Sequence, residues 1–233
     1  MAFETGQATI AETEKLTEAR AAIAEALASS SAPCLTCSFQ AEDMAVLALI
    51  REKAPDIPVL FLETGYHFAE TYQYRDEMTV RYGLNLVNVI PKQTVAEQES
   101  QFGILNRTAP DRCCKLRKVE PLFSSLEGYD TWFTGLRRVQ SPTRANLAVR
   151  DLFPLPTGKK IPKVSPLASW TDKDVWTFTK ERGIPLLPLY EKGYTSIGCE
   201  PCTAIPEAGA DARSGRWAGK KLECGIHTFS EKS

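Results

Sequence analysis

Alternation of buried strands with amphipathic helices is the feature that most restricts how this 233-residue chain can fold. Short apolar runs rich in β-branched and large side chains predict strands, and longer segments with helical spacing lie between them. In chain order the prediction is strand 33–39, helix 41–53, strand 57–64, helix 67–83 and strand 84–90. This order favours an α/β domain with a mainly parallel central sheet and helices on both faces.

The flanking regions extend the same pattern. Leu16, Ala19, Ile23 and Leu27 recur at helical spacing and predict a first helix over residues 9–29. The later predictions are a mainly helical region 94–128 with a turn near 106–112, a strand over 129–137, irregular strand and turn over 151–167, and a helix over 169–183 capped by Thr171 and Asp174. Beyond Ile184 regular patterns are scarce, so we expect one α/β domain over 1–205 and a mobile C-terminal tail over 206–233.

Composition excludes several classes of function. The formal net charge is −1, whereas proteins that bind nucleic acid mainly through electrostatics are usually basic. The longest apolar run, Met44 to Ile50, is too short to cross a bilayer. The N-terminal sequence lacks the basic start and apolar stretch of a signal peptide. We therefore expect a cytoplasmic protein that binds neither nucleic acid nor membrane.

Four of the seven cysteines occur in two pairs that suit metal binding. An odd number of cysteines in a chain of this size argues against a disulfide framework. The adjacent pair in "RCCKLRK" (112–118) and the CxxC in "GCEPC" (198–202) together supply four thiolates, enough for zinc or an iron–sulfur cluster. Neighbouring side chains point about 100° apart on a helix, so the adjacent pair suits a cubane better than one ion. Four unrelated buried cysteines are the alternative. Cys34 and Cys37, in a predicted strand, are expected in the core.

Two loops that follow predicted strands carry polar and basic residues. "TCSFQAEDM" (36–44) offers hydroxyls and backbone N–H groups at a helix start, which can hold a phosphate or can be an ordinary polar loop. "GLRRVQSPTR" (135–144) places three arginines after a strand, where a parallel sheet binds its ligands. Arginine forks suit phosphate and sulfate, although a solvated basic turn would have the same composition.

The tail combines basic groups with a thiol and a histidine. Arg213 and Arg216 lie three residues apart, and "ECGIH" places Cys224 three residues before His227. A nearby cation lowers the pKa of a thiol and makes it a nucleophile, so Cys224 is a candidate for covalent chemistry. We assign no chemistry to His67, which is expected at the start of a helix.

Taken together, "CCKLRK", "TSIGCEPCT" and "ECGIH" resemble the motifs of the iron–sulfur branch of the adenylyl-sulfate (APS) and phosphoadenylyl-sulfate (PAPS) reductase family. "SFQAEDM", "LETGYHFAET" and "GLRRVQS" match its nucleotide-binding segments, and the resemblance covers about residues 34–227. Glu63 stands where the family commonly has aspartate. The resemblance implies the Rossmann-like adenine nucleotide α-hydrolase fold and the assimilatory reduction of APS to sulfite and AMP.

The resemblance also implies roles for individual residues. Substrate would be bound by Ser38, Gly65, Gly135, Arg138, Arg144, Arg213 and Arg216, and one 4Fe–4S cluster per chain by Cys113, Cys114, Cys199 and Cys202. Cys224 would attack the sulfur with His227 and Lys118 as further catalytic groups, and thioredoxin or glutaredoxin would release sulfite from the Cys S-sulfonate. A homo-oligomer is expected.

Three other interpretations remain open from the sequence. PAPS, or both APS and PAPS, could be the substrate. A pyrophosphatase-type enzyme that thiolates tRNA with ATP also combines a nucleotide loop with clustered cysteines, but generally has an SGGxDS-like loop that "SFQAEDM" lacks. A zinc-stabilised binding protein without catalysis would use the four cysteines structurally.

Overall fold

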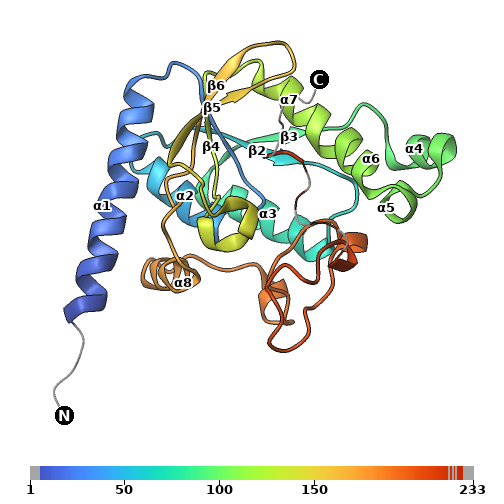
Figure 1. Ribbon diagram of the computed structural model, residues 1–233. Coiled ribbons are helices and arrows are strands. Elements are labelled where there is room, and N and C mark those ends of the chain that lie inside the picture. The colour runs from blue at the N-terminus through green and yellow to red at the C-terminus, as the bar shows by residue number, and fades with distance from the viewer. Residues whose placement is uncertain (1–5, 220, 222, 224, 228–233) are drawn as a thin grey trace.

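A single six-stranded sheet forms the centre of the computed structural model, which describes residues 6–219, 221, 223 and 225–227 (Figure 1). The strands are β1 Pro33–Thr36, β2 Pro58–Leu62, β3 Asn85–Val89, β4 Thr131–Phe133, β5 Arg150–Pro154 and β6 Lys160–Val164. Their order in the sheet is β3-β2-β1-β4-β6-β5. All pairings are parallel except the β5–β6 hairpin, so the predicted α/β fold class is confirmed.

Helices cover both faces of this sheet. The helices are α1 Gly6–Ala28, α2 Ala41–Arg51, α3 Ala69–Tyr82, α4 Val95–Phe102, α5 Leu105–Thr108, α6 Pro110–Cys114, α7 Glu120–Leu126 and α8 Asp172–Glu181. One core joins α1, α2, α3 and α8 to the sheet, and a second, smaller core on the α7 side surrounds the fully buried Trp132. Among the described helices none is both long and apolar enough to cross a bilayer.

Local sequence signals account for several helix ends. Gly83 closes α3 in the left-handed conformation, with φ of 56°. Thr171 and Asp174 form the capping box predicted for α8, because each side chain accepts a hydrogen bond from the other residue's backbone N–H. α3 begins at Ala69 rather than at His67, whose backbone instead pairs with that of Cys199.

Three predicted segments differ from the structure. The region 151–167, predicted as irregular, contains a regular hairpin whose β6 joins β4, so sheet pairing overrides the effect of its prolines. The predicted strand 129–137 is paired as β4 only over Thr131–Phe133. The predicted turn near 106–112 is a break at Ala109, between α5 and α6.

Candidate active site

The strand order reverses between β1 and β4, and a pocket lies where the loops after these two strands meet. Such a switch point is where open parallel sheets bind ligands. The close approach of the two loops depends on Gly135, since a Cβ there would lie 2.2 Å from Oδ1 of Asp43. Ser38 from the β1 loop and Gly135 from the β4 loop, both predicted to bind substrate, line this pocket.

Asp43 occupies the position at which a loop of this kind could receive a phosphate. Its Oδ2 accepts hydrogen bonds from the backbone N–H and the hydroxyl of Ser38, both at 2.6 Å. Burial and the neighbouring charge of Glu42 raise the pKa of Asp43 to about 7, although hydrogen bonds from Ser38 and Gly135 favour the ionised form. The Ser38 N–H, one of the donors that the sequence offered to a phosphate, is therefore already satisfied by a carboxylate of the same chain.

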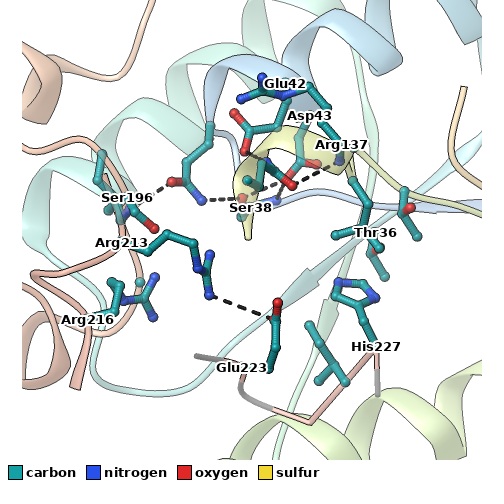
Figure 2. Close-up of a pocket in the computed structure, with 18 of the residues that line it drawn as sticks. Thr36, Ser38, Glu42, Asp43, Arg137, Ser196, Arg213, Arg216, Glu223 and His227 are labelled. Atoms are coloured by element: carbon teal, nitrogen blue, oxygen red, sulfur yellow. Dashed lines mark hydrogen bonds and ion pairs between the residues drawn. The ribbon is translucent and has the colours of Figure 1, made fainter. Parts of the chain in front are cut away.

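Cations line much of the pocket. Figure 2 shows Arg213 and Arg216 reaching from their loop toward the side on which Glu223 and His227 lie. The cations that line the pocket are Lys118, Arg137, Arg144, Arg213 and Arg216. Arg216 is 6% exposed and packs so closely on Gly198 that a Cβ there would lie 2.1 Å from its guanidinium. The arrangement would attract an anion.

The structure separates the predicted arginines of the β4 loop. Arg138 is not among the lining residues, and its Nε donates to the carbonyl oxygen of Leu147 at 2.9 Å. Its neighbour Arg137, which was not selected from the sequence, does line the pocket and pairs with Asp172 at 2.7 Å. The order of the two arginines carries no signal from which this difference could have been predicted.

The described residues of the tail are docked against the pocket. Glu223 forms an ion pair with Arg144, and His227 stacks on Trp132 with ring centroids 5.5 Å apart and an interplanar angle of 17°. Ile226 packs against the smaller core. Cys224, the predicted nucleophile, lies outside the described residues.

A second, smaller pocket is lined by all four cysteines predicted to bind metal, Cys113, Cys114, Cys199 and Cys202. Burial, followed by the mutual charges of the thiolates, raises the pKa of Cys113 to about 11. Nζ of Lys221 lies 3.4 Å from Sγ of Cys114, and Lys118 lines both pockets. In the described part of the chain no group of three or more His, Cys, Asp or Glu side chains is placed to hold a metal ion as it stands.

The backbone around the cysteine pair is unusual. A π-helical turn, Lys115–Val119, follows α6 directly and joins it to α7. Such turns are rare and occur frequently at functional sites. The turn carries Lys118 and Arg117.

The "LETGYH" loop lies between the two pockets. Sγ of Cys199 is 3.3 Å from the hydroxyl of Thr64, and Leu62 and His67 line the larger pocket. Gly65, predicted to approach the adenosine, is not a lining residue. Oε1 of Glu63 accepts hydrogen bonds from the Gly65 N–H at 2.7 Å and the Tyr72 hydroxyl at 2.5 Å. Glu63 therefore shapes this loop.

Residues 32–205 match the phosphoadenosine phosphosulfate reductase domain. The chain belongs to this family. The family predicted from the motifs is thus confirmed, and the match includes both cysteine pairs and ends before the tail.

Curated relatives in the family are similar over most of their length. The chain is 47% identical over 188 residues to adenosine 5′-phosphosulfate reductase of Mycolicibacterium smegmatis, covering 80% of this chain and 78% of the relative. It is 46% identical over 198 residues to the protein of the same name from Mycobacterium tuberculosis, covering 82% and 77%.

Solved structures share the fold. Phosphoadenylyl-sulfate reductase from Candida auris aligns with a TM-score of 0.70 at 23% identity, over 88% of this chain and 99% of that one. FMN adenylyltransferase from Candida glabrata aligns with a TM-score of 0.65 at 14% identity, over 99% of this chain and 79% of that one. Both support the adenine nucleotide α-hydrolase-like architecture.

Proposed function

We propose that this protein reduces APS to sulfite and AMP with electrons from a thiol. The observation that carries the proposal is the cationic pocket at the β1–β4 switch point, against which Glu223 and His227 of the "ECGIH" segment are docked. Its relatives at 46–47% identity carry the name of this activity. A phosphosulfate anhydride is an anion, and a thiolate that attacks it is another, so the cations are needed to offset their repulsion.

In the proposed reaction the thiolate of Cys224 attacks the sulfur of the sulfate group. A new S–S bond forms, the bond from sulfur to the bridging oxygen breaks, and AMP leaves with that electron pair. Lys118, Arg213 and Arg216 hold the phosphosulfate and offset the charge on the leaving oxygen. The product on the enzyme is a Cys S-sulfonate, and no electron donor is consumed in this step.

Sulfite is released in a second, thiol-dependent step. A thiolate of thioredoxin or glutaredoxin attacks Sγ of Cys224, the S–S bond to the sulfonate breaks, and sulfite departs. The second thiol of the donor then resolves the mixed disulfide and restores Cys224. The proposed reaction requires the tail to expose residue 224 to a protein partner between the two steps. We also propose that the protein is located in the cytoplasm and forms a homo-oligomer.

The chemistry of the small pocket fits an iron–sulfur cluster. Four thiols line it, burial followed by the charges of neighbouring thiolates raises the pKa of Cys113 and of Cys202, and the cations Lys118 and Lys221 lie beside the thiols. We propose that Cys113, Cys114, Cys199 and Cys202 hold a 4Fe–4S cluster. When bound, the cluster would supply a charged centre that organises the basic segment 112–118 near the sulfate, without acting as the electron donor.

Intact mass spectrometry tests the proposal without a reductant. Anaerobic protein with its metal centre is incubated with APS or, separately, with PAPS. The expected result is an adduct of the mass of SO₃ on the peptide that contains Cys224 after incubation with APS. An adduct that forms with PAPS but not with APS would identify PAPS as the substrate instead. Cys224→Ser should bind APS but form no adduct, and sulfite release by this variant would refute the assignment.

Metal analysis tests the small pocket separately. We expect iron and acid-labile sulfide with visible absorption in the purified protein, and loss of both in Cys199→Ser. A colourless protein that contains zinc instead would contradict the cluster.

A further inference from the structure

Glu223, the residue before Cys224, has a role that the proposed reaction does not use. Its carboxylate binds Arg144 through two contacts, at 2.8 Å from Nε and 2.7 Å from the terminal nitrogen. The hydroxyl of Thr143 donates to the same carboxylate at 3.0 Å, and Arg213 lies 3.8 Å away. The Glu223 side chain is 9% exposed.

These contacts place a carboxylate inside the cationic pocket. Burial opposes ionisation of Glu223, but the hydrogen bonds from Arg144 and the charge of Arg213 keep its pKa below the ordinary value. Two of its partners, Arg144 and Arg213, are residues predicted to bind the phosphosulfate. The chain thus supplies its own anion to cations that the substrate needs (Figure 2).

The same contacts join the tail to the β4 loop. Thr143 and Arg144 belong to a 3₁₀ turn, Pro142–Arg144, which Ser141 caps by accepting a hydrogen bond from the Thr143 N–H. A two-pronged Arg–carboxylate contact fixes orientation as well as distance. The contact therefore holds Glu223 of the tail against the β4 loop.

We infer that Glu223 is a positioning residue with two opposed effects on the reaction. It anchors the tail, which carries the proposed nucleophile Cys224, to the β4 loop, and it competes with the substrate's anionic group for Arg144 and Arg213. This inference rests on the proposed function. It predicts that removal of the charge strengthens substrate binding while it slows the chemical step.

A purely structural role predicts a different result. If Glu223 only stabilised the folded tail, its loss would weaken binding and slow adduct formation together, because the pocket would be less complete. Tighter substrate binding together with slower adduct formation therefore distinguishes a positioning role from a general loss of structure.

Single-turnover formation of the sulfonate adduct measures both quantities. The holoprotein is mixed with increasing APS, quenched, and analysed by intact mass to give the half-saturating APS concentration and the maximal rate. For Glu223→Gln we expect the half-saturating concentration to fall by about 3–10-fold and the maximal rate to fall by at least about 10-fold, since one buried charge contact is worth about a factor of ten.

Two variants separate the effects. Thr143→Val removes one anchoring hydrogen bond without changing charge, so the maximal rate should fall while half-saturation stays within about 2-fold of the wild type. Glu207→Gln makes the same charge change at an exposed position of the tail and should alter neither value, because solvent and salt screen it.

The outcomes separate this inference from the proposed function. If the wild type forms no adduct, the proposed function fails. If the wild type reacts but Glu223→Gln binds APS no more tightly, competition for the arginines is refuted; if its maximal rate is unchanged, the anchor is refuted. Should Glu223→Gln fail to fold, an unchanged maximal rate in Thr143→Val would still refute the anchor.

Discussion

The imidazole of His227 stacks on the indole of Trp132, with ring centroids 5.5 Å apart. Burial and then the positive charges of Lys163, Arg144 and Arg213 lower the pKa of His227 well below its ordinary value. The carboxylate of Glu223 is the negative group nearby, and it is already paired with Arg144. The imidazole of the docked tail is therefore neutral at physiological pH and carries one N–H and one lone pair.

The first prediction is that His227 does not titrate between pH 6 and 8. NMR of the imidazole nitrogens can test this directly, because the chain has only two histidines. The signals that are missing from the spectrum of His227→Gln are those of His227. Because the docked ring resists protonation, docking should weaken as pH falls below the ordinary histidine pKa, by up to about 1.4 kcal/mol per pH unit. A His227 ring that titrates near pH 6.5 would contradict the docked arrangement.

The second prediction concerns Asp43, whose pKa is raised to about 7. A carboxyl with a raised pKa holds its proton more tightly in the folded state, so its contribution to stability is complete at low pH and is lost as pH rises from about 4 through 7. Over this range the free energy of unfolding of the wild type should fall, relative to that of Asp43→Asn, by on the order of a few kcal/mol. Urea unfolding at several pH values measures the difference. Parallel pH curves for wild type and Asp43→Asn would refute the prediction.

The third prediction is that Gly135→Ala disrupts the junction of the β1 and β4 loops. Its Cβ would lie 2.2 Å from Oδ1 and 3.1 Å from the backbone nitrogen of Asp43, so the loops must separate. Overpacking of this kind costs about 1–3 kcal/mol of stability, and half-saturating APS should rise at least about 10-fold. Gly128→Ala, whose Cβ meets no atom closer than 3.6 Å, is the matched control. Unchanged APS binding in Gly135→Ala would show that the close approach is not needed.

Much of the fold could be predicted because it depends on local periodicity. The strands before Ser38, Glu63 and Ile90 and the helices between them carry their patterns within a few residues. Parallel strands then fix which loops share an edge of the sheet, so Ser38 and Gly135 could be expected near each other. The two cysteine pairs could be expected to meet because four soft ligands share one chemistry, and the structure places all four around one pocket.

The remaining features depend on contacts between distant parts of the chain. Asp43 reads in the sequence as a favourable acidic residue in the first turn of a helix, and only the folded structure reveals that burial and the neighbouring charge of Glu42 raise its pKa. Arg137 and Arg138 are chemically equivalent in the sequence. An extended backbone at Arg137, followed by a 3₁₀ turn that begins at Arg138, sends one guanidinium into the pocket and the other to Leu147. Propensities do not encode such differences.

Arg117 connects the two pockets through the backbone of the "LETGYH" loop, and this gives the fourth prediction. Its side chain is 4% exposed and donates to the carbonyl oxygens of Thr64 and, at 3.2 Å, Gln93, and to Oε1 of Gln98 at 3.2 Å. Arg117→Met keeps the apolar stem but leaves these buried acceptors without their donor. Each unsatisfied group costs about 1–3 kcal/mol, so unfolding free energy should fall by about 2–4 kcal/mol in urea.

Arg117→Lys should recover only part of this loss, because an ammonium cannot reproduce the planar fork that reaches several acceptors at once. Arg107→Met, at an exposed position on α5, should change stability by no more than about 0.5 kcal/mol. Since the carbonyl of Thr64 fixes the loop that carries Leu62 and His67 into the larger pocket, Arg117→Met should also weaken APS binding. If Arg117→Met is destabilised but binds APS normally, the loop keeps its position without Arg117. If Arg117→Met is as stable as the wild type, water replaces the guanidinium at little cost.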